Sequence, residues 1–347
     1  MTITVIDFEE GAEVRVYDSL DQIGEITPGR AVWVDVETDD FAQMSQIAST
    51  FGFHELTVED CLSPGHFPKL DDYGSYLFMI LRGLKPWNEI EEIWQEVNQE
   101  PSEASATQTS VGTKEQESYT RKVAVYLSQN LIVTFRRREV AWLDALVRRA
   151  QTKPDSTLSE GTEGVAHRVI DVLVDRFTRG IGFFENVVDA FEDAALEKPD
   201  EFEIQDLFEV KRELVYLRQV ARNQRSIISQ LANDSTLISD NQRRRYFKDI
   251  DDHAVEIVHG LDKQIQTVIS IRDSYLAVAN VRLGDTMRIL TVITTIAAPL
   301  NIVVGLYGMN FKAIPMLHNP YGFWFILGTM LAVAIGMLAY FRKKHWI

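Results

Sequence analysis

Two long uncharged runs near the C-terminal end constrain this chain more than any other feature. Residues 289–307 read ILTVITTIAAPLNIVVGLY, and residues 323–341 read FWFILGTMLAVAIGMLAYF. As an α-helix each run would be about 28 Å long, close to the roughly 30 Å thickness of the hydrocarbon core of a bilayer. Only residues 308–322 separate them. The sequence therefore predicts two transmembrane helices joined by a short loop.

Basic residues lie on one side of this predicted hairpin. Arg342, Lys343 and Lys344 follow the second run directly, and Arg282 and Arg288 precede the first. Because positively charged flanks stay on the cytoplasmic side, both ends of the chain are expected in the cytoplasm. We therefore expect a multi-pass protein of the inner (plasma) membrane of the cell.

The remainder of the chain is acidic. The net charge is −16 at pH 7, and every acidic residue precedes the first run. This charge argues against nucleic acid as a partner and favours cations, although ordinary solubility explains the net charge equally well. Cys61 is the only cysteine. No intrachain disulfide can form, and a reducing compartment is expected.

Residues 1–160 have the pattern of a small α/β domain. Short runs rich in β-branched and aromatic residues predict strands, and they are bounded by Gly, Pro and Asp. The expected strands are 3–8, 13–17, 31–36, 76–84, 123–127 and 131–135, and the expected helices are 41–51, 54–62 and 141–150. The polar stretch 89–118 is interpreted as a flexible insertion in a hairpin. The chain has no phosphate-binding loop, nucleophile turn or Rossmann glycine set, so neither an enzyme nor a nucleotide partner is expected.

From residue 161 onward the pattern changes to long helices, expected at 165–196, 202–231 and 243–307. The last would be on the order of 100 Å long. Its apolar residues recur every three or four positions: Phe247, Ile250, Ala254, Ile257, Leu261, Ile265, Val268, Leu276, Ala279, Leu283, Met287 and Leu290. This spacing predicts a helix that packs in a bundle or associates with copies of itself. The chain is thus divided into an α/β domain (1–160), a helical domain and stalk (161–288), two transmembrane helices (289–341) and a basic tail (342–347).

The first span contains polar residues, whereas the second is uniformly apolar. Counting back from Asn310, the residues Asn301, Thr294, Leu290 and Met287 fall close to one helical stripe. An amide deep in a span usually faces protein or water, so this stripe is a candidate pore lining. Hydrogen bonding between helices is the alternative interpretation of Asn301. The second span is expected to be an outer, lipid-facing helix.

Several motifs together carry a family resemblance. The sequence YGMN ends the first span, at Tyr307–Asn310, and a second span and a basic tail follow it. The accompanying segments are Glu59–Asp60 with Pro68–Lys69, LVYLR at Leu214–Arg218 with Arg225, the stalk start at Tyr246–His253, and MRILT at Met287–Thr291. In these features the chain resembles the CorA family of divalent-cation channels. It departs from the family pattern at Asn223, where proline is usual, and at Met316, where Glu is frequent.

The resemblance implies a funnel-shaped homopentamer whose first span lines a pore for Mg²⁺, with Co²⁺ or Ni²⁺ as further candidate ions. Gly308, Met309 and Asn310 would form the selectivity filter. Neutral amide oxygens suit a hydrated ion that must be bound weakly enough to leave. Met287 and Leu290 would form an apolar constriction that closes by excluding water. The loop after the filter contains no acidic residue, so we expect weaker capture of ions at the outer mouth.

The resemblance also implies regulation by intracellular Mg²⁺ bound between subunits, at positions that correspond to Asp249 and Asp171. Carboxylates at an interface repel one another unless a cation bridges them. By contrast, Asp251, Asp252 and Glu256 are expected to be solvated surface charges.

Two alternatives to Mg²⁺ transport remain. One is a Zn²⁺ transporter of the same superfamily, against which the GMN motif and the scattered histidines argue. The other is a membrane-tethered sensor or scaffold that uses the stalk as a coiled coil.

Overall fold

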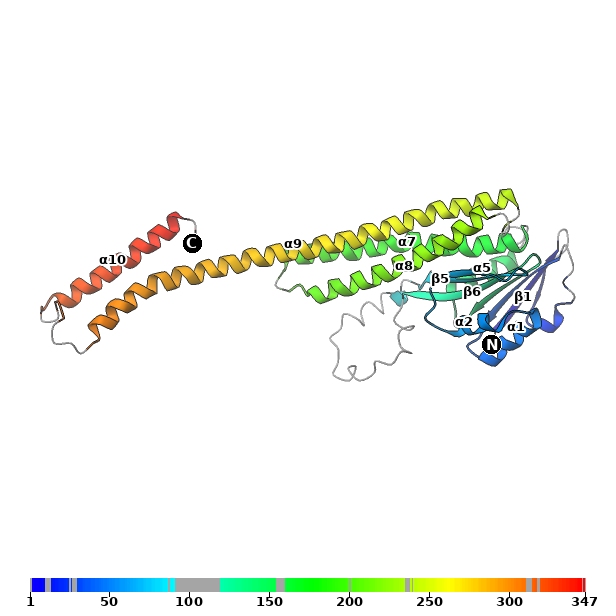
Figure 1. Cartoon of the computed structure of the whole chain (residues 1–347), viewed down its shortest axis with the longest axis horizontal. Coiled ribbons are helices and arrows are strands. Elements are labelled where there is room, and N and C mark those ends of the chain that lie inside the picture. Colours follow the sequence, from blue (N-terminus) through cyan, green and yellow to red (C-terminus); the bar gives the residue numbers. More distant parts are fainter. Residues whose placement is uncertain are drawn as a thin grey trace. The chain divides into compact units, whose positions relative to one another are not determined.

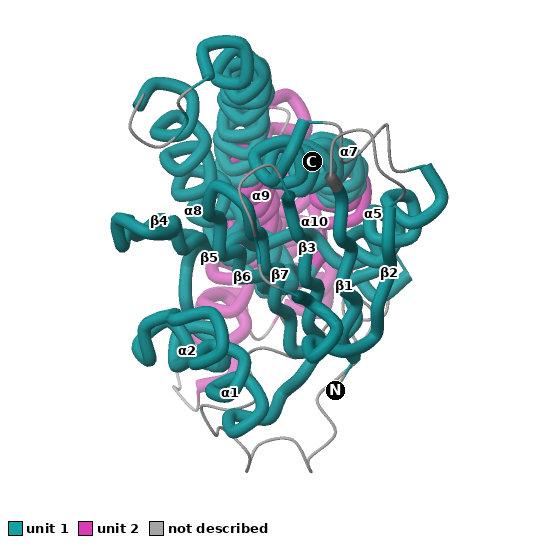
Figure 2. Tube along the Cα trace, turned by 90° about the vertical axis from the view of Figure 1, so that its right-hand side faces the viewer, with its two compact units in different colours: residues 1–192, 203–269 teal, residues 193–202, 270–347 magenta. Residues whose placement is uncertain are grey.

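The computed structural model describes the chain apart from residues 1, 10–13, 25, 27–29, 87, 91–118, 154–159, 200, 235–237, 239, 310–313, 317–318, 345 and 347. It consists of two compact units, shown in teal and magenta in Figure 2. Unit 1 comprises residues 1–192 and 203–269, and unit 2 comprises residues 193–202 and 270–347. The division at residues 160, 288 and 341 stays a prediction.

Unit 1 contains a mixed seven-stranded sheet in the order β2-β1-β3-β7-β6-β5-β4 (Figure 2). The strands are β1 (Thr2–Glu9), β2 (Arg15–Tyr17), β3 (Arg30–Glu37), β4 (Lys69–Asp72), β5 (Leu77–Leu84), β6 (Thr120–Leu127) and β7 (Leu131–Arg136). Neighbouring strands are antiparallel except β3 and β7, which are parallel. All but β4 overlap a predicted strand. β4 has the polar sequence KLDD and lies at the edge of the sheet, where charged residues discourage pairing with another chain.

The sheet separates two packed faces. Helices α1 (Phe41–Phe51) and α2 (Glu55–Leu62) cover one face (Figure 1), and a core cluster beneath them includes Met44, Val58 and Phe78. Both helices were predicted from the sequence. On the other face, helix α5 (Ala141–Thr152) places the Trp142 indole against β5. A Cβ atom on Gly83 would lie 2.6 Å from the Trp142 nitrogen, so only glycine leaves room for the ring.

Strands β5 and β6 pair in an antiparallel arrangement from Leu77 with Leu127 to Leu84 with Thr120. This pairing confirms the hairpin expected around the polar stretch. Most of the predicted insertion, residues 91–118, lies outside the described residues.

Three long helices follow, α7 (Gly161–Glu197), α8 (Ile204–Asn233) and α9 (Asn241–Tyr307). Within unit 1, α7 and α9 run parallel: Arg243 pairs with Glu163 at 2.7 Å, and Lys263 pairs with Glu185 at 3.0 Å. The helices approach closely at Gly260, where a Cβ atom would lie 3.1 Å from the Ile181 side chain. The predicted helices are therefore present, and their register follows from these contacts.

Unit 2 contains the remainder of α9 and helix α10 (Gly322–Lys343), which include the two predicted spans. Both helices are long and apolar enough to cross a membrane. Pro299 lies inside α9 without ending the helix, although proline cannot donate a backbone hydrogen bond. Before α10, Met316 has a left-handed backbone with φ 67°, and its carbonyl oxygen lies directly against Gly322, where a Cβ atom would clash.

Candidate ion path

The predicted pore residues lie on one face of α9 in unit 2. They are Met287, Leu290, Thr294 and Asn301, and all four are exposed. With 3.6 residues per turn, they fall within an arc of about 60°. The structure therefore supports the stripe expected from their spacing.

This stripe does not take part in the packing of α9 on α10. The groove between the two helices is lined on α9 by Ile289, Val292, Ile293, Ile296, Ala297 and Leu300. These residues are centred roughly 120° away from the polar stripe around the helix. Because α10 engages a different face, the Asn301 face is left available to water or to another chain.

The threonine of the stripe, Thr294, forms its side-chain hydrogen bond within its own helix. The Thr294 hydroxyl donates to the Leu290 carbonyl oxygen at 2.9 Å, a bond that is common for threonine in membrane helices. The hydroxyl proton therefore needs no acceptor in the surroundings. Asn301 is the exposed amide of this face.

The α9 helix ends at the predicted filter. The Gly308 amide donates to the Val304 carbonyl at 2.9 Å, and a Cβ atom on Gly308 would lie 3.2 Å from that oxygen. The Tyr307 hydroxyl donates to the Pro315 carbonyl at 3.1 Å, which ties the helix end to the loop before α10. Met309 is exposed, and Asn310 lies outside the described residues.

The predicted regulatory residues lie on the two parallel helices of unit 1. Asp249 is exposed on α9, whereas Asp171 is half-buried on α7. Burial raises the pKa of Asp171, and the nearby His167 opposes that shift. Asp175 and His253 also lie near Asp171, but no contact between Asp171 and Asp249 is found among the described residues.

Burial also lowers the pKa of His167, and Asp171 opposes that shift. The His167 ring packs edge-on against Phe247 with centroids 5.5 Å apart. Across the described part of the chain, no three His, Cys, Asp or Glu side chains are arranged to hold a metal ion. Asp171 and Asp249 are therefore not part of such a group within the described part of the chain. The sequence reasoning did not single out His167, although its spacing of four residues from Asp171 on one helix was a usable signal.

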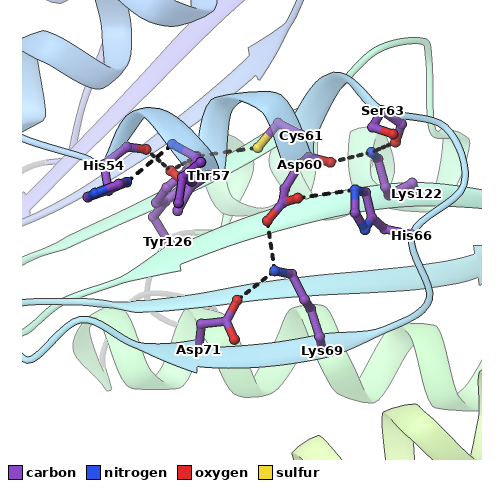
Figure 3. Close-up of polar contacts among 11 residues, drawn as sticks. His54, Thr57, Asp60, Cys61, Ser63, His66, Lys69, Asp71, Lys122 and Tyr126 are labelled. Carbon is purple, nitrogen blue, oxygen red and sulfur yellow. Dashed lines mark hydrogen bonds and ion pairs between the residues drawn. The ribbon is translucent and has the colours of Figure 1, made fainter.

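A polar network surrounds α2 in unit 1 (Figure 3). The Asp60 carboxylate accepts from Lys69 at 2.7 Å and lies 3.1 Å from the His66 imidazole. Lys69 also pairs with Asp71 at 2.7 Å. Lys122 of β6 donates to the backbone carbonyls of Asp60 and Ser63 at the end of α2. The contacts hold α2 to the β4 edge of the sheet, so these charged residues have a structural role.

Cys61 lies beside this network but faces the core. The thiol is buried and lies 3.3 Å from the Tyr126 hydroxyl. Burial raises the pKa of the Cys61 thiol to about 12. The thiolate is therefore scarce at neutral pH, and the cysteine is chemically inert.

Comparison with known proteins identifies the chain. A protein-family profile described as "CorA-like Mg2+ transporter protein" matches residues 29–98 and 105–343. The chain belongs to the CorA family. It is therefore a divalent-cation transporter of the membrane and not an enzyme, as the resemblance implied.

Alignments with known relatives extend over most of this CorA-family chain. The cobalt/magnesium transport protein CorA of Thermotoga maritima is 25% identical over 304 residues, which cover 88% of this chain and 80% of the relative. The complete structure of the CorA magnesium transporter from Methanocaldococcus jannaschii has a TM-score of 0.80 and 19% identity, and covers 100% of both chains. A more distant relative, the zinc transport protein ZntB of Pectobacterium carotovorum, is 23% identical over 65% of this chain and 68% of its own length. The family thus includes members named for different metals.

The family segments quoted from the sequence include residues that hold elements together. Asp60 and Lys69, from the Glu59–Asp60 and Pro68–Lys69 segments, form the ion pair described above. In the LVYLR helix, Arg218 pairs with Asp262 of α9 at 3.0 Å, and Arg225 lies 3.6 Å from Asp251.

The expectation that Asp251 is a solvated surface charge was wrong. Asp251 is half-buried, and burial raises its pKa against the opposing effect of Arg225. Its neighbour Asp252 is exposed, as is Glu256. The difference arises because Asp251 lies on the side of α9 that faces α8, a relation that requires the tertiary structure.

Proposed function

We propose that the chain forms a homopentameric channel for Mg²⁺ entry at the inner membrane, with both ends of the chain in the cytoplasm. The first span lines the pore, with Gly308, Met309 and Asn310 as its filter. Intracellular Mg²⁺ bound between subunits at Asp249 and Asp171 keeps the channel closed. Co²⁺ and Ni²⁺ are further candidate ions.

One observation carries the oligomeric part of the proposal. Between residues 270 and 288, before the apolar span begins, α9 has large apolar side chains that are exposed. Leu276, Leu283 and Met287 are 47%, 63% and 57% exposed, and at 3.6 residues per turn they lie on one face of the helix. A contiguous apolar surface in water marks an interaction site. Copies of the same helix would cover these residues, as the three-and-four spacing predicts.

The ion path follows from the chemistry of the α9 stripe. Mg²⁺ loses its water shell reluctantly, so neutral oxygens of Asn310 and Asn301 suit a hydrated ion better than a carboxylate ring would. Met287 and Leu290 give a narrow apolar zone below the amides, which closes to ions when it loses water. A doubly charged ion gains about 4.6 kcal/mol on entering down 100 mV, so no nucleotide is required.

Regulation follows from the charge around α7 and α9. Mg²⁺ that binds only the closed state stabilises that state by about 1.4 kcal/mol per site when its concentration is ten times its Kd. Five equivalent sites would bias the gate strongly even if each is weak. When the ion leaves, the facing carboxylates repel and the closed arrangement loosens.

The test of transport is cation uptake by the purified chain in liposomes, compared among Mg²⁺, Co²⁺, Ni²⁺ and Zn²⁺. We expect uptake of Mg²⁺ driven by an inside-negative potential and its loss in Asn310→Ala. The second candidate function is Zn²⁺ transport, and the observation behind it is the relative that is named for zinc transport. Uptake of Zn²⁺ without Mg²⁺ would establish that candidate, and absence of any uptake would favour a sensor or scaffold.

The test of regulation is protease resistance of the purified chain across a Mg²⁺ titration. Asp249→Lys should protect the stalk without Mg²⁺, because the ammonium group replaces the bridging charge. Asp252→Lys is the matched control, since Asp252 is an exposed neighbour. If wild type and Asp249→Lys have the same Mg²⁺ dependence, the sensor lies elsewhere.

A further inference from the structure

An apolar groove runs along the hairpin of unit 2, on the face of α9 away from the polar stripe. Its volume is about 710 Å³, and its walls are Ile289, Val292, Ile293, Ile296, Ala297 and Leu300 of α9, with Leu338 of α10 and Trp346. That volume is in the range of roughly 300–1,000 Å³ typical of small-molecule sites. The groove has no charged wall residue, so any occupant must be apolar along its length.

The length of the groove matches one leaflet of a bilayer. Ile289 and Leu300 are eleven positions apart, which corresponds to about 16 Å along a helix. The hydrocarbon core is roughly 30 Å thick, so the groove extends from one interface to about the middle. An acyl chain that lies parallel to the helices would fill it from end to end.

The interfacial end of the groove is closed by Trp346. The chain turns back after α10, because the Trp346 amide donates to the Phe341 carbonyl at 3.1 Å. The Trp346 ring stacks on Phe341 with centroids 5.6 Å apart and remains 38% exposed. Tryptophan in this position is typical of a residue at the level of lipid headgroups.

Basic residues lie near the Trp346 end of the groove. Arg342, Lys343 and Lys344 are exposed, and Arg342 is one helical turn beyond the groove residue Leu338. Arg288 precedes the groove on α9 and pairs with Asp285 at 2.8 Å, so that basic residue is largely neutralised. Three basic residues therefore remain to bind an anionic group, and no acidic side chain balances them among the described residues of the tail.

We propose that the groove binds one acyl chain of an anionic phospholipid, whose phosphate is held by Arg342, Lys343 and Lys344. The occupant is a lipid of the cytoplasmic leaflet, because the groove ends at the basic side of the hairpin. The proposal requires the two spans in a bilayer but does not require that they conduct ions. Each basic residue near a membrane surface favours anionic lipid, and three together give a preference of roughly 100-fold at most.

Trp346 serves as a local reporter of the lipid. Trp324 and Trp346 are the tryptophans of unit 2, so Trp324→Phe leaves Trp346 as its single tryptophan. The full chain in this background is reconstituted in phosphatidylcholine vesicles. Phosphatidylglycerol or phosphatidylcholine with brominated acyl chains is then added in increasing proportion, since bromine quenches tryptophan fluorescence on contact. We expect brominated phosphatidylglycerol to produce the same quenching of Trp346 as brominated phosphatidylcholine at a proportion that is at least roughly tenfold lower.

Two variants test the two halves of the site separately. Replacing Arg342, Lys343 and Lys344 with Gln should abolish the preference for phosphatidylglycerol. Ala297→Phe should fill the groove and weaken quenching by both lipids. Ala332→Phe is the matched control, because Ala332 is exposed on α10 and lines neither described groove of the hairpin.

Equal quenching by the two lipids in the parent protein would overturn the proposal, as would an unchanged preference in the Gln variant. Equal effects of Ala297→Phe and Ala332→Phe would also exclude the groove. No quenching by either lipid would mean that a second protein chain covers this face. Because the experiment involves no cation gradient, its outcome is independent of whether the channel conducts.

Discussion

The two parts of α9 have the same sequence pattern and opposite surroundings. In unit 1 its periodic apolar residues are buried, with Phe247 0% and Leu261 1% exposed. In unit 2 the same spacing continues, but Leu283 and Met287 are 63% and 57% exposed. The first part packs against α7 and α8 of its own chain, whereas Leu283 and Met287 have no such cover among the described residues of unit 2.

The charges of the two parts differ in the same way. In unit 1, α9 pairs with distant segments, for example Asp262 with Arg218 at 3.0 Å. In unit 2, the pairs Arg272 with Asp273 and Arg288 with Asp285 join near neighbours of one helix. The comparison shows that a three-and-four spacing predicts burial but does not say by what. Substitutions in unit 1 should therefore affect folding, and substitutions in unit 2 should affect assembly or transport.

The largest effect is expected at the filter. Asn310→Ala should reduce Mg²⁺ uptake into liposomes to background, because the amide would bind the waters of the hydrated ion, while assembly measured by size-exclusion chromatography stays unchanged. Asn319→Ala is the control, since the Asn319 side chain accepts from the Tyr321 amide in the same loop. Uptake at the wild-type rate in Asn310→Ala would remove this residue from the filter.

The next effect concerns folding of unit 1. Phe247→Ala should lower the free energy of unfolding by about 3–5 kcal/mol, because it leaves a cavity in a packed core. Leu283→Ala should change it by less than about 0.5 kcal/mol but weaken the oligomer. Denaturation followed by the buried Trp33 measures the first quantity, and light scattering measures the second. Similar destabilisation by both changes would contradict the contrast between the units.

A smaller effect is expected at the constriction. Leu290→Asn should hydrate the apolar zone and raise Mg²⁺ uptake severalfold when internal Mg²⁺ is high. Leu306→Asn introduces the same amide at an exposed position of α9 outside the stripe and should leave uptake unchanged. The measurement is uptake into liposomes preloaded with Mg²⁺. If Leu290→Asn behaves like wild type there, the constriction is at another residue.

The smallest effect concerns pH and unit 1. The pKa of His167 is lowered by burial, so the folded state binds this proton less readily than the unfolded state does. The contribution of neutral His167 to the free energy of unfolding is therefore fully present above the unfolded pKa of about 6.5. This contribution is lost as pH falls toward the folded pKa. In His167→Asn, the denaturation midpoint of the full chain should vary less than wild type between about pH 5 and pH 7. Parallel pH curves for the two proteins would show that His167 does not titrate on unfolding.

Much of the fold follows from short-range patterns. The helix at Phe41–Phe51 was predicted with the bounds that the structure gives, because Asp40 caps its start and Gly52 ends it in a left-handed conformation. The strand at Lys69–Asp72 was not predicted, since its sequence KLDD contains a single apolar residue and shows no alternation. The candidate pore stripe was predicted because its residues lie on one helix, where spacing alone defines a face.

The sequence by itself determined the two apolar helices, the other long helices, the family motifs and six of the seven strands. Each of these depends on residues that are close in the chain, so periodicity and the absence of charge are sufficient to recognise them. Only the tertiary structure decided which charges are paired, as in Arg225 with Asp251 and Lys69 with Asp60. It also decided where the apolar stripe of α9 passes from buried to exposed. These outcomes depend on contacts between residues far apart in sequence, and a pattern along one helix contains no information about the surface that the rest of the chain brings against it.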